Sequence, residues 1–316
     1  MNYRRLGKSG LQLSELSLGS WVTFGDQIDD AVAETCMRTA YEAGVNFFDN
    51  AEGYAAGKSE VVMGNNLKKL GWSRDTFVVS SKVFWGGGKP NQTGLSRKHV
   101  FEACDAALRR LQVDYLDLYF CHRPDPNTLI EETVWAMHQL IMAGKVLYWG
   151  TSEWAADQIM EAYAVARREH LTPPTMEQPQ YSMLCRRRFE QEYARLYNPA
   201  TVGLGTTVWS PLAGGVLTGK YGKGIPKDSR AARPGMQWWS KNFDSDASKR
   251  KFETVEKLRP IASDLGCSLA TLAIAWVLKN PNVSTAILGA TRPEQLQETL
   301  QATDVAPKLT TEMLDK

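Results

Sequence analysis

Four side chains suited to acid–base chemistry stand at or just after the ends of strand-like runs. Asp49, Lys82 and His122 each close an apolar run. Tyr54 lies in the glycine-containing loop that follows the first of these runs, the one ending at Asp49. In a barrel of parallel strands the carboxyl ends of the strands meet at one rim, which is where enzymes of this architecture hold their active sites. We therefore expect these residues to converge into one Asp–Tyr–Lys–His group.

Such a group is suited to polarising a carbonyl. A free phenol has a pKa near 10 and donates a proton poorly at neutral pH, but a nearby ammonium lowers that pKa. We expect Lys82 to lower the pKa of Tyr54 and Asp49 to hold Lys82 charged and aimed. His122 is expected to hydrogen-bond a carbonyl oxygen and to share in proton transfer. Since no side chain supplies hydride, a reduction here requires a cofactor.

Each of these residues taken alone is more often a helix cap, a surface ion pair or a locally satisfied histidine. The functional interpretation depends on all four reaching the same rim, and therefore on the strands that carry them. Eight strand candidates follow one another along the chain: Leu16–Ser20, Asn46–Asp49, Thr76–Lys82, Tyr115–His122, Val146–Ser152, Thr175–Gln180, Thr206–Ser210 and Thr285–Gly289.

Amphipathic helical stretches separate these strands. They are 30–42, 58–70, 97–111, 129–142, 155–168, 189–196, 247–265, 269–279 and 293–302. The alternation predicts a single α/β domain over residues 1–316, a (β/α)8 TIM barrel preceded by a short β-hairpin at Tyr3–Leu13. The main alternative is a doubly wound open sheet, which normally carries a GxGxxG turn after its first strand; Leu18–Trp21 does not supply one.

One long segment, Leu212–Asp246, follows the seventh strand and breaks this rhythm. It is rich in glycine and proline, contains Lys220, Arg230 and Arg233, and includes two adjacent tryptophans, Trp238 and Trp239. A loop of this length in a compact domain is usually functional or disordered, and the tryptophans argue against plain disorder. We expect it to fold over a bound ligand and gate its release.

The composition excludes several classes of function. The net charge is +2 with no dense basic tract, which argues against nucleic-acid binding. No apolar run is long enough to cross a membrane, and the first residues lack the apolar core of a signal peptide. The five cysteines form no CxxC pair and indicate reduced thiols in a cytoplasmic protein. No metal site is expected.

Several blocks of sequence resemble the aldo-keto reductase superfamily, and within it the branch of voltage-gated potassium channel β-subunits. Phe47–Tyr54 is similar to the signature around the catalytic Asp and Tyr of that family. Further matching blocks are GSWVTFG (19–25), YAAGK (54–58), KVFWGG (82–87), LSRKH (95–99), RPDPNT (123–128), YWGTS (148–152) and WSPLAGG (209–215). The resemblance covers nearly the whole chain.

The resemblance implies a barrel that binds NADPH without a Rossmann domain and reduces small carbonyl compounds. It implies that Asp49, Tyr54, Lys82 and His122 form a catalytic tetrad. Cofactor contacts are implied for Gly19, Ser20, Trp21, Gln27, Asp49, Ser152, Gln178, Trp209, Ser210, Pro211, Leu212, Ala213, Gly214, Lys220, Arg230, Gly289, Thr291, Gln295 and Glu298. Substrate contacts are implied for Trp21, Tyr54, Trp85 and His122.

The channel branch gives a second interpretation, a regulatory subunit that senses nicotinamide redox state and docks on a membrane channel; a cofactor-free barrel scaffold is a third. Channel subunits carry Asn at the position of His122, Arg at that of Glu153 and Asn at that of Thr299. His122 is instead the residue of most catalytic members of the wider family, so we favour the reductase. The resemblance also suggests a homotetramer or an octamer.

Overall fold

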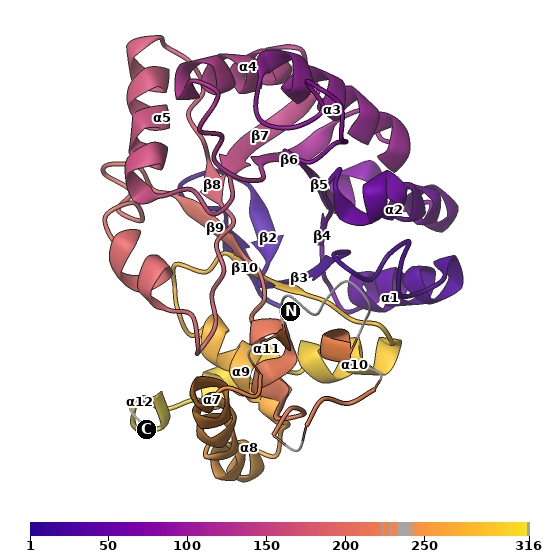
Figure 1. The fold of residues 1–316 in the computed structure, drawn as a ribbon, viewed down its shortest axis with the longest axis vertical. Coiled ribbons are helices and arrows are strands. Elements are labelled where there is room, and N and C mark those ends of the chain that lie inside the picture. The colour runs from indigo at the N-terminus through magenta and orange to yellow at the C-terminus, as the bar shows by residue number, and fades with distance from the viewer. Residues whose placement is uncertain (223, 228, 233–239, 242, 315–316) are drawn as a thin grey trace.

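The computed structural model describes residues 1–222, 224–227, 229–232, 240–241 and 243–314. Within them, eight parallel strands close into a barrel in the order β10-β3-β4-β5-β6-β7-β8-β9, as the sequence predicts (Figure 1). The strands are β3 (Leu16–Gly19), β4 (Phe47–Asp49), β5 (Val78–Val83), β6 (Leu116–Cys121), β7 (Val146–Thr151), β8 (Met176–Glu177), β9 (Gly205–Val208) and β10 (Thr285–Leu288). The doubly wound alternative is thereby excluded.

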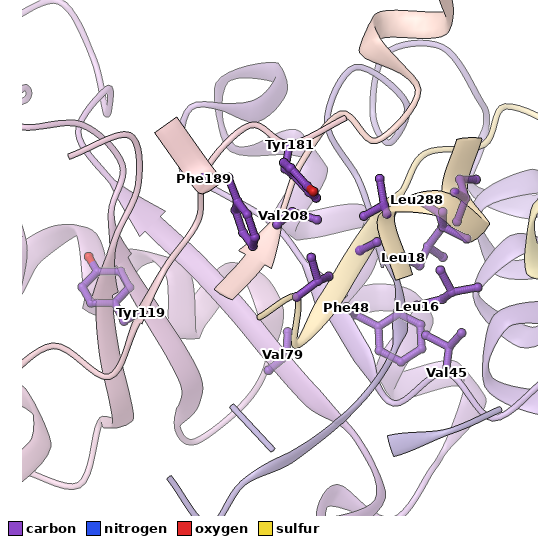
Figure 2. Packing of buried hydrophobic residues seen from close by; sticks show 14 of the residues in the cluster. Leu16, Leu18, Val45, Phe48, Val79, Tyr119, Tyr181, Phe189, Val208 and Leu288 are labelled. Carbon is purple, nitrogen blue, oxygen red and sulfur yellow. The ribbon is translucent and has the colours of Figure 1, made fainter. Parts of the chain in front are cut away.

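Neighbouring residues of each barrel strand face opposite sides of the barrel wall. Phe47 and Val78 belong to a small buried cluster inside the barrel, whereas the next residues, Phe48 and Val79, belong to the large cluster between the strands and the helices. Figure 2 shows part of that large cluster. This period of two follows from the pleat of a strand, and it fixes which side chains reach the barrel interior.

Helices surround the barrel (Figure 1). They are α1 (Asp30–Glu42), α2 (Lys58–Leu70), α3 (Arg97–Leu111), α4 (Ile130–Met142), α5 (Ala156–Arg168), α7 (Asp246–Glu256), α8 (Arg259–Asp264), α9 (Leu269–Leu278), α10 (Pro293–Leu300), α11 (Ala302–Val305) and α12 (Thr311–Leu314). Local signals fix several ends. Asp29 and Ser96 cap α1 and α3 by accepting backbone N–H groups, and Gly71 ends α2 with a positive φ of 64°.

A two-stranded hairpin, β1 (Tyr3–Arg5) and β2 (Gln12–Ser14), closes the amino-terminal end of the barrel and confirms the predicted hairpin. Its Leu6 and Leu13 are fully buried in the interior cluster. Gly7 has a φ of 57°, and a Cβ there would lie 2.3 Å from the carbonyl oxygen of Gly203, just before β9. The hairpin therefore plugs the end of the barrel opposite to the carboxyl ends of its strands.

Two predicted helices were wrong in detail. The segment expected as a helix over 189–196 forms a single π-helical turn, Arg188–Glu192, followed by turns. The segment expected as one helix over 247–265 is divided into α7 and α8, with Pro260 in the first turn of α8. Proline lacks the N–H that a continuous helix would need and is favoured where a helix starts, so it marks the break.

Among the described residues, no single helix is long and apolar enough to cross a membrane. The segments Asp246–Asp264 and Leu269–Lys279 meet the requirement only together, and they are bent by 88° relative to each other.

Candidate active site

Three predicted residues reach the inside of the barrel because they share the inward alternation of their strands. Asp49 lies two residues after the inward-facing Phe47, and His122 lies two residues after the inward-facing Phe120. Lys82 has the same alternation on β5, where Val78 faces inward, and its side chain is fully buried. All three stand at the carboxyl ends of β4, β5 and β6, at one rim, as their positions in the sequence predict.

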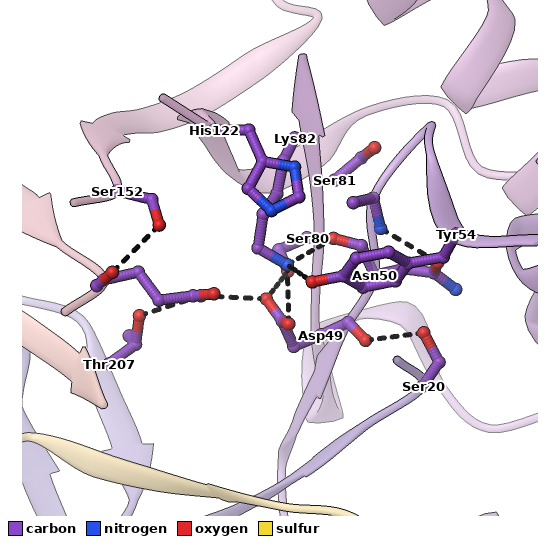
Figure 3. A network of polar contacts seen from close by, with 12 residues as sticks. Ser20, Asp49, Asn50, Tyr54, Ser80, Ser81, Lys82, His122, Ser152 and Thr207 are labelled. Carbon is purple, nitrogen blue, oxygen red and sulfur yellow. Dashed lines mark hydrogen bonds and ion pairs between the residues drawn. The ribbon is translucent and has the colours of Figure 1, made fainter. Parts of the chain in front are cut away.

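A chain of short polar contacts joins these residues to Tyr54 (Figure 3). The Lys82 ammonium donates to Asp49 Oδ2 at 2.6 Å, to the backbone carbonyl of Asn50 at 2.7 Å and to the Tyr54 hydroxyl at 3.1 Å. The ammonium thus uses its three N–H groups on a carboxylate, a carbonyl and a phenol. Its direction is fixed, and one of its protons points to the Tyr54 oxygen.

The loop that carries Tyr54 has an unusual backbone. Ala55, Ala56 and Gly57 follow Tyr54 with φ values of 49°, 52° and 86°. Non-glycine residues rarely adopt the left-handed region, and such strain concentrates at functional sites. This turn joins Tyr54 directly to the start of α2 at Lys58 and leaves the phenol beside Lys82.

Burial, not Lys82, decides the ionisation of Tyr54. Burial raises the pKa of the phenol, the ammonium of Lys82 lowers it, Asp49 raises it, and the net direction is upward. The predicted effect of Lys82, a lowering of this pKa, is present, but the effect of burial is larger. For Lys82 burial acts in the opposite direction and lowers the pKa of the ammonium. Asp49 and Tyr54 together raise that pKa by more, so the lysine stays charged.

His122 is held neutral. Burial, followed by the charges of Lys82 and Arg123, keeps the pKa of its imidazole well below the ordinary value. Its ring lies 5.7 Å from the Tyr54 ring and 4.8 Å from the Trp85 ring, both edge to face. Its Nδ1 is buried and has no hydrogen-bond partner among the described residues. A neutral imidazole suits a hydrogen bond to a carbonyl oxygen better than the proton transfer expected from the sequence.

Residues from the two neighbouring strands and from the opposite side of the barrel hold Asp49 in place. Ser80 Oγ donates to Asp49 Oδ1 at 2.8 Å, and Gln178 Nε2 donates to the same oxygen at 3.1 Å. Ser20 Oγ donates to the backbone carbonyl of Asp49 at 3.0 Å. Ser152 Oγ donates to the backbone carbonyl of Gln178 at 2.9 Å. The carboxylate is therefore oriented both from the adjacent strand and from across the barrel.

A cavity of about 880 Å³ opens above this network. It brings together most of the residues implied as cofactor or substrate contacts: Gly19, Trp21, Gln27, Asp49, Tyr54, Trp85, His122, Ser152, Gln178, Trp209, Ser210, Pro211, Leu212, Gly214, Lys220, Gly289, Thr291, Gln295 and Glu298. Lys82 and Ser20 lie below its surface, and Ala213 is not among its lining residues. Arg233, Trp238, Trp239 and the side chain of Arg230 lie outside the described part of the chain.

Sequence reasoning missed several lining residues. Arg123, Gly53, Thr23 and Arg292 also line the cavity, as does Ser268 at the start of α9. Arg123 had a signal, since it directly follows His122 at a strand end. Ser268 had none, because its approach to the cavity depends on how α9 packs.

Glu153 orients Trp209, one of the walls of the cavity. Glu153 Oε1 accepts the indole N–H of Trp209 at 3.0 Å and the backbone N–H of Gln180 at 2.6 Å. Its other oxygen pairs with Arg188 at 2.6 Å. Trp209 meets Trp21 edge to face, with ring centroids 6.1 Å apart. Glu153 thus supports the wall through Trp209.

Comparisons with known proteins agree with this fold and site. The sequence profile described as "Aldo/keto reductase family" matches residues 15–316, and the chain belongs to that family. Two similar proteins, from Oryza sativa subsp. japonica and Arabidopsis thaliana, are each described as "Probable voltage-gated potassium channel subunit beta". Each is 52% identical over 317 residues, covering 100% of this chain and 95% of the relative.

Proposed function

We propose that this protein is an NADPH-dependent reductase that converts aldehydes or ketones to alcohols, with Tyr54 as the general acid. The observation that carries the proposal is the 3.1 Å contact between the Tyr54 hydroxyl and the buried ammonium of Lys82, at the edge of a cavity that also exposes His122. Membership of the aldo/keto reductase family supports oxidoreductase chemistry of this kind. In this proposal residues 1–316 act as one domain.

The residues around the cavity fit a nicotinamide dinucleotide. The volume of about 880 Å³ lies in the usual range of ligand sites. Ser152 and Gln178 offer polar groups for a carboxamide, and Trp209 offers an aromatic face. Lys220 and Arg292 line the cavity and suit phosphates. A Cβ at Gly289 would meet nothing within 4 Å, so the backbone there is open to close approach.

The proposed chemistry assigns one task to each side chain. When bound, reduced nicotinamide supplies a hydride to the carbonyl carbon. Tyr54 keeps its proton at neutral pH, as an ordinary phenol does and as burial favours further, and it donates that proton to the carbonyl oxygen. Lys82 then stabilises the phenolate by the hydrogen bond that it already donates. Neutral His122 orients the carbonyl oxygen.

Two features support the preference for NADPH and the gating role of the long loop. Arg292 lines the cavity beside Thr291 and Gln295 and supplies a cation where those two neighbours are neutral. Pro226 and Ser229, within the loop after β9, also line the cavity. The loop therefore contributes to the walls of the proposed cofactor site.

The proposal is tested by following NADPH absorbance with 4-nitrobenzaldehyde, and NADH in parallel. Tyr54→Phe removes only the hydroxyl, so turnover should fall roughly 10²–10⁴-fold, the usual contribution of a general acid. Binding of NADPH, measured by quenching of tryptophan fluorescence, should persist. Near-normal turnover by the Phe variant would refute the role of Tyr54. Failure of NADPH to bind the wild type would refute the cofactor and support a cofactor-free scaffold.

The similarity to proteins described as channel β-subunits favours a second candidate function. In that role the same site would sense nicotinamide redox state while the barrel docks on a channel, as a homotetramer or octamer. His122 favours the reductase. Measurable turnover with wild type, and its loss in Tyr54→Phe, would separate catalysis from a role in binding alone. The five free cysteines, three of them buried, support a cytoplasmic location.

A further inference from the structure

Arg123 stands beside the reacting groups but has no part in the chemistry proposed above. It directly follows His122 and lines the same cavity. Its Nη1 donates to the backbone carbonyl of His122 and, at 3.3 Å, to Ser152 Oγ. Its guanidinium carbon lies 5.4 Å from the centre of the Trp85 ring. The charge is therefore held against one wall of the cavity by neutral groups.

No carboxylate of the described residues forms an ion pair with Arg123. Asp125 is the nearest acid in sequence, but it accepts the backbone N–H groups of Leu95 and Asn127 and the hydroxyl of Thr128. Both hydrogen bonds described above are donated by Arg123 Nη1. A guanidinium has five N–H donors in a planar fork, so most of its capacity is not used by those contacts.

The position of this charge bears on the substrate. The electrostatic effect of Arg123 reaches the reacting groups, since its charge lowers the pKa of both His122 and Tyr54. Lys82, the other cation beside them, is buried and committed to Asp49. Arg123 is thus the charge that a substrate lying against Trp85 and His122 would meet in the cavity.

We propose that Arg123 is a substrate-binding residue and that the preferred substrates are carbonyl compounds carrying an anionic group, a carboxylate or a phosphate, a short distance from the carbonyl. The fork of Arg123 binds the anion while His122 and Tyr54 face the carbonyl oxygen. Trp85 packs against the body of the substrate and holds the guanidinium in place by cation–π contact. This inference rests on the proposed reductase function and adds the class of its substrates.

The test uses the enzyme with its nicotinamide cofactor and a pair of nearly isosteric substrates, 4-carboxybenzaldehyde and 4-nitrobenzaldehyde. The Arg123→Gln variant should lose on the order of 10- to 100-fold in kcat/KM for the carboxylate, the size of one charge-assisted contact, and little for the nitro compound. Arg123→Lys should retain part of the preference. Lys89→Gln, which removes an exposed charge from the nearby loop, is the matched control and should change neither value.

Two further arms identify the anion: succinic semialdehyde against butanal for a carboxylate, and glyceraldehyde 3-phosphate against glyceraldehyde for a phosphate. The pair in which Arg123→Gln causes the larger loss of kcat/KM for the charged aldehyde, relative to the neutral one, identifies the anionic group as carboxylate or phosphate. An equal fall for charged and neutral members of every pair would mean that Arg123 only supports Trp85 and Ser152, and would overturn the inference.

Binding is measured independently of turnover. Calorimetric titration of the NADP⁺-loaded protein with 4-(hydroxymethyl)benzoate should give an affinity that falls in Arg123→Gln, whereas 4-nitrobenzyl alcohol should show no such change. An affinity independent of Arg123 would overturn the anion site. If no aldehyde is reduced but the acid still binds through Arg123, the anion site stands and the reductase function fails.

Discussion

At the scale of single residues, the buried pair of Asp49 and Lys82 couples stability to the proposed chemistry. The two side chains are 4% and 0% exposed and lie 2.6 Å apart. Removing one partner of such a pair leaves a buried charge uncompensated, which typically costs about 3–5 kcal/mol. Lys82→Met should therefore lower the free energy of unfolding by that order and should abolish most turnover.

The double variant Asp49→Asn/Lys82→Met separates these two effects. With both charges removed, most of the lost stability should return, while turnover should stay low because the hydrogen bond to Tyr54 is gone. Lys98→Met, in the exposed pair with Glu102, is the control and should cost less than about 1 kcal/mol. Full activity in the double variant, measured beside denaturant unfolding, would show that Lys82 has only a structural role.

The identities and common rim of the four predicted residues could be anticipated because strand alternation is a local property. Val78 and Lys82 are four residues apart on one strand, so an inward-facing valine implies an inward-facing lysine. The ionisation of Tyr54 could not be anticipated. Its direction depends on how completely the closed barrel excludes water, and no local pattern contains that information.

At the scale of elements, two loops at the rim are joined through a buried carboxylate. Glu52, two residues before Tyr54, accepts the backbone N–H of Phe84 at 2.6 Å, and its other oxygen lies 3.3 Å from His99 Nε2 at the start of α3. His99 Nδ1 in turn lies 2.9 Å from the carbonyl oxygen of Gly94. Glu52 and His99 thus connect both ends of the loop that carries Trp85 to the loop that carries Tyr54.

We expect Glu52→Gln to loosen the loop that carries Trp85. The amide can still accept from Phe84 but loses its charged contact with His99, worth about 1.5–3 kcal/mol. KM for aromatic aldehydes should rise about 10- to 100-fold, the size of that contact, with a smaller effect on kcat. Residues 84–94 should exchange amide hydrogens faster. Glu102→Gln, which alters an exposed carboxylate of α3, is the control; identical exchange in both variants would contradict the linkage.

Sequence patterns predicted the helices well where apolar periodicity and caps agreed, as in α1, α2 and α3. They failed at 189–196, where the helical pattern is confined to a π-helical turn. There the buried Phe189 stacks on Tyr181 at 4.1 Å, a contact between separate segments that no local periodicity reveals. The same limit applies to the link between Glu52 and His99.

At the scale of the whole molecule, the wall between barrel and helices contains an acid that should make stability depend on pH. Glu177, on β8, points away from Gln178 and the site and is fully buried. Burial raises the pKa of its carboxyl from 4.5 to about 8, although the hydroxyl of Thr151 donates to it and acts in the opposite direction. The folded protein therefore retains a proton that the unfolded chain has lost between these two values.

Stability should consequently fall as pH rises through this window and level off above it, because the folded state binds more protons than the unfolded state. Between pH 6 and pH 9 the loss attributable to Glu177 should be roughly 2–3 kcal/mol. Glu177→Gln places a neutral group of the same shape there, and this group does not titrate. The free energy of unfolding of the variant, minus that of wild type, should therefore increase by that amount from pH 6 to pH 9. Thermal unfolding at both values measures the gain. Glu161→Gln, exposed on α5, is the control and should give a constant difference from wild type. If the difference in stability between Glu177→Gln and wild type does not change with pH, Glu177 is ionised in the folded protein. The partners that stabilise its charge would then have to be sought among Thr151, Tyr193 and Arg188.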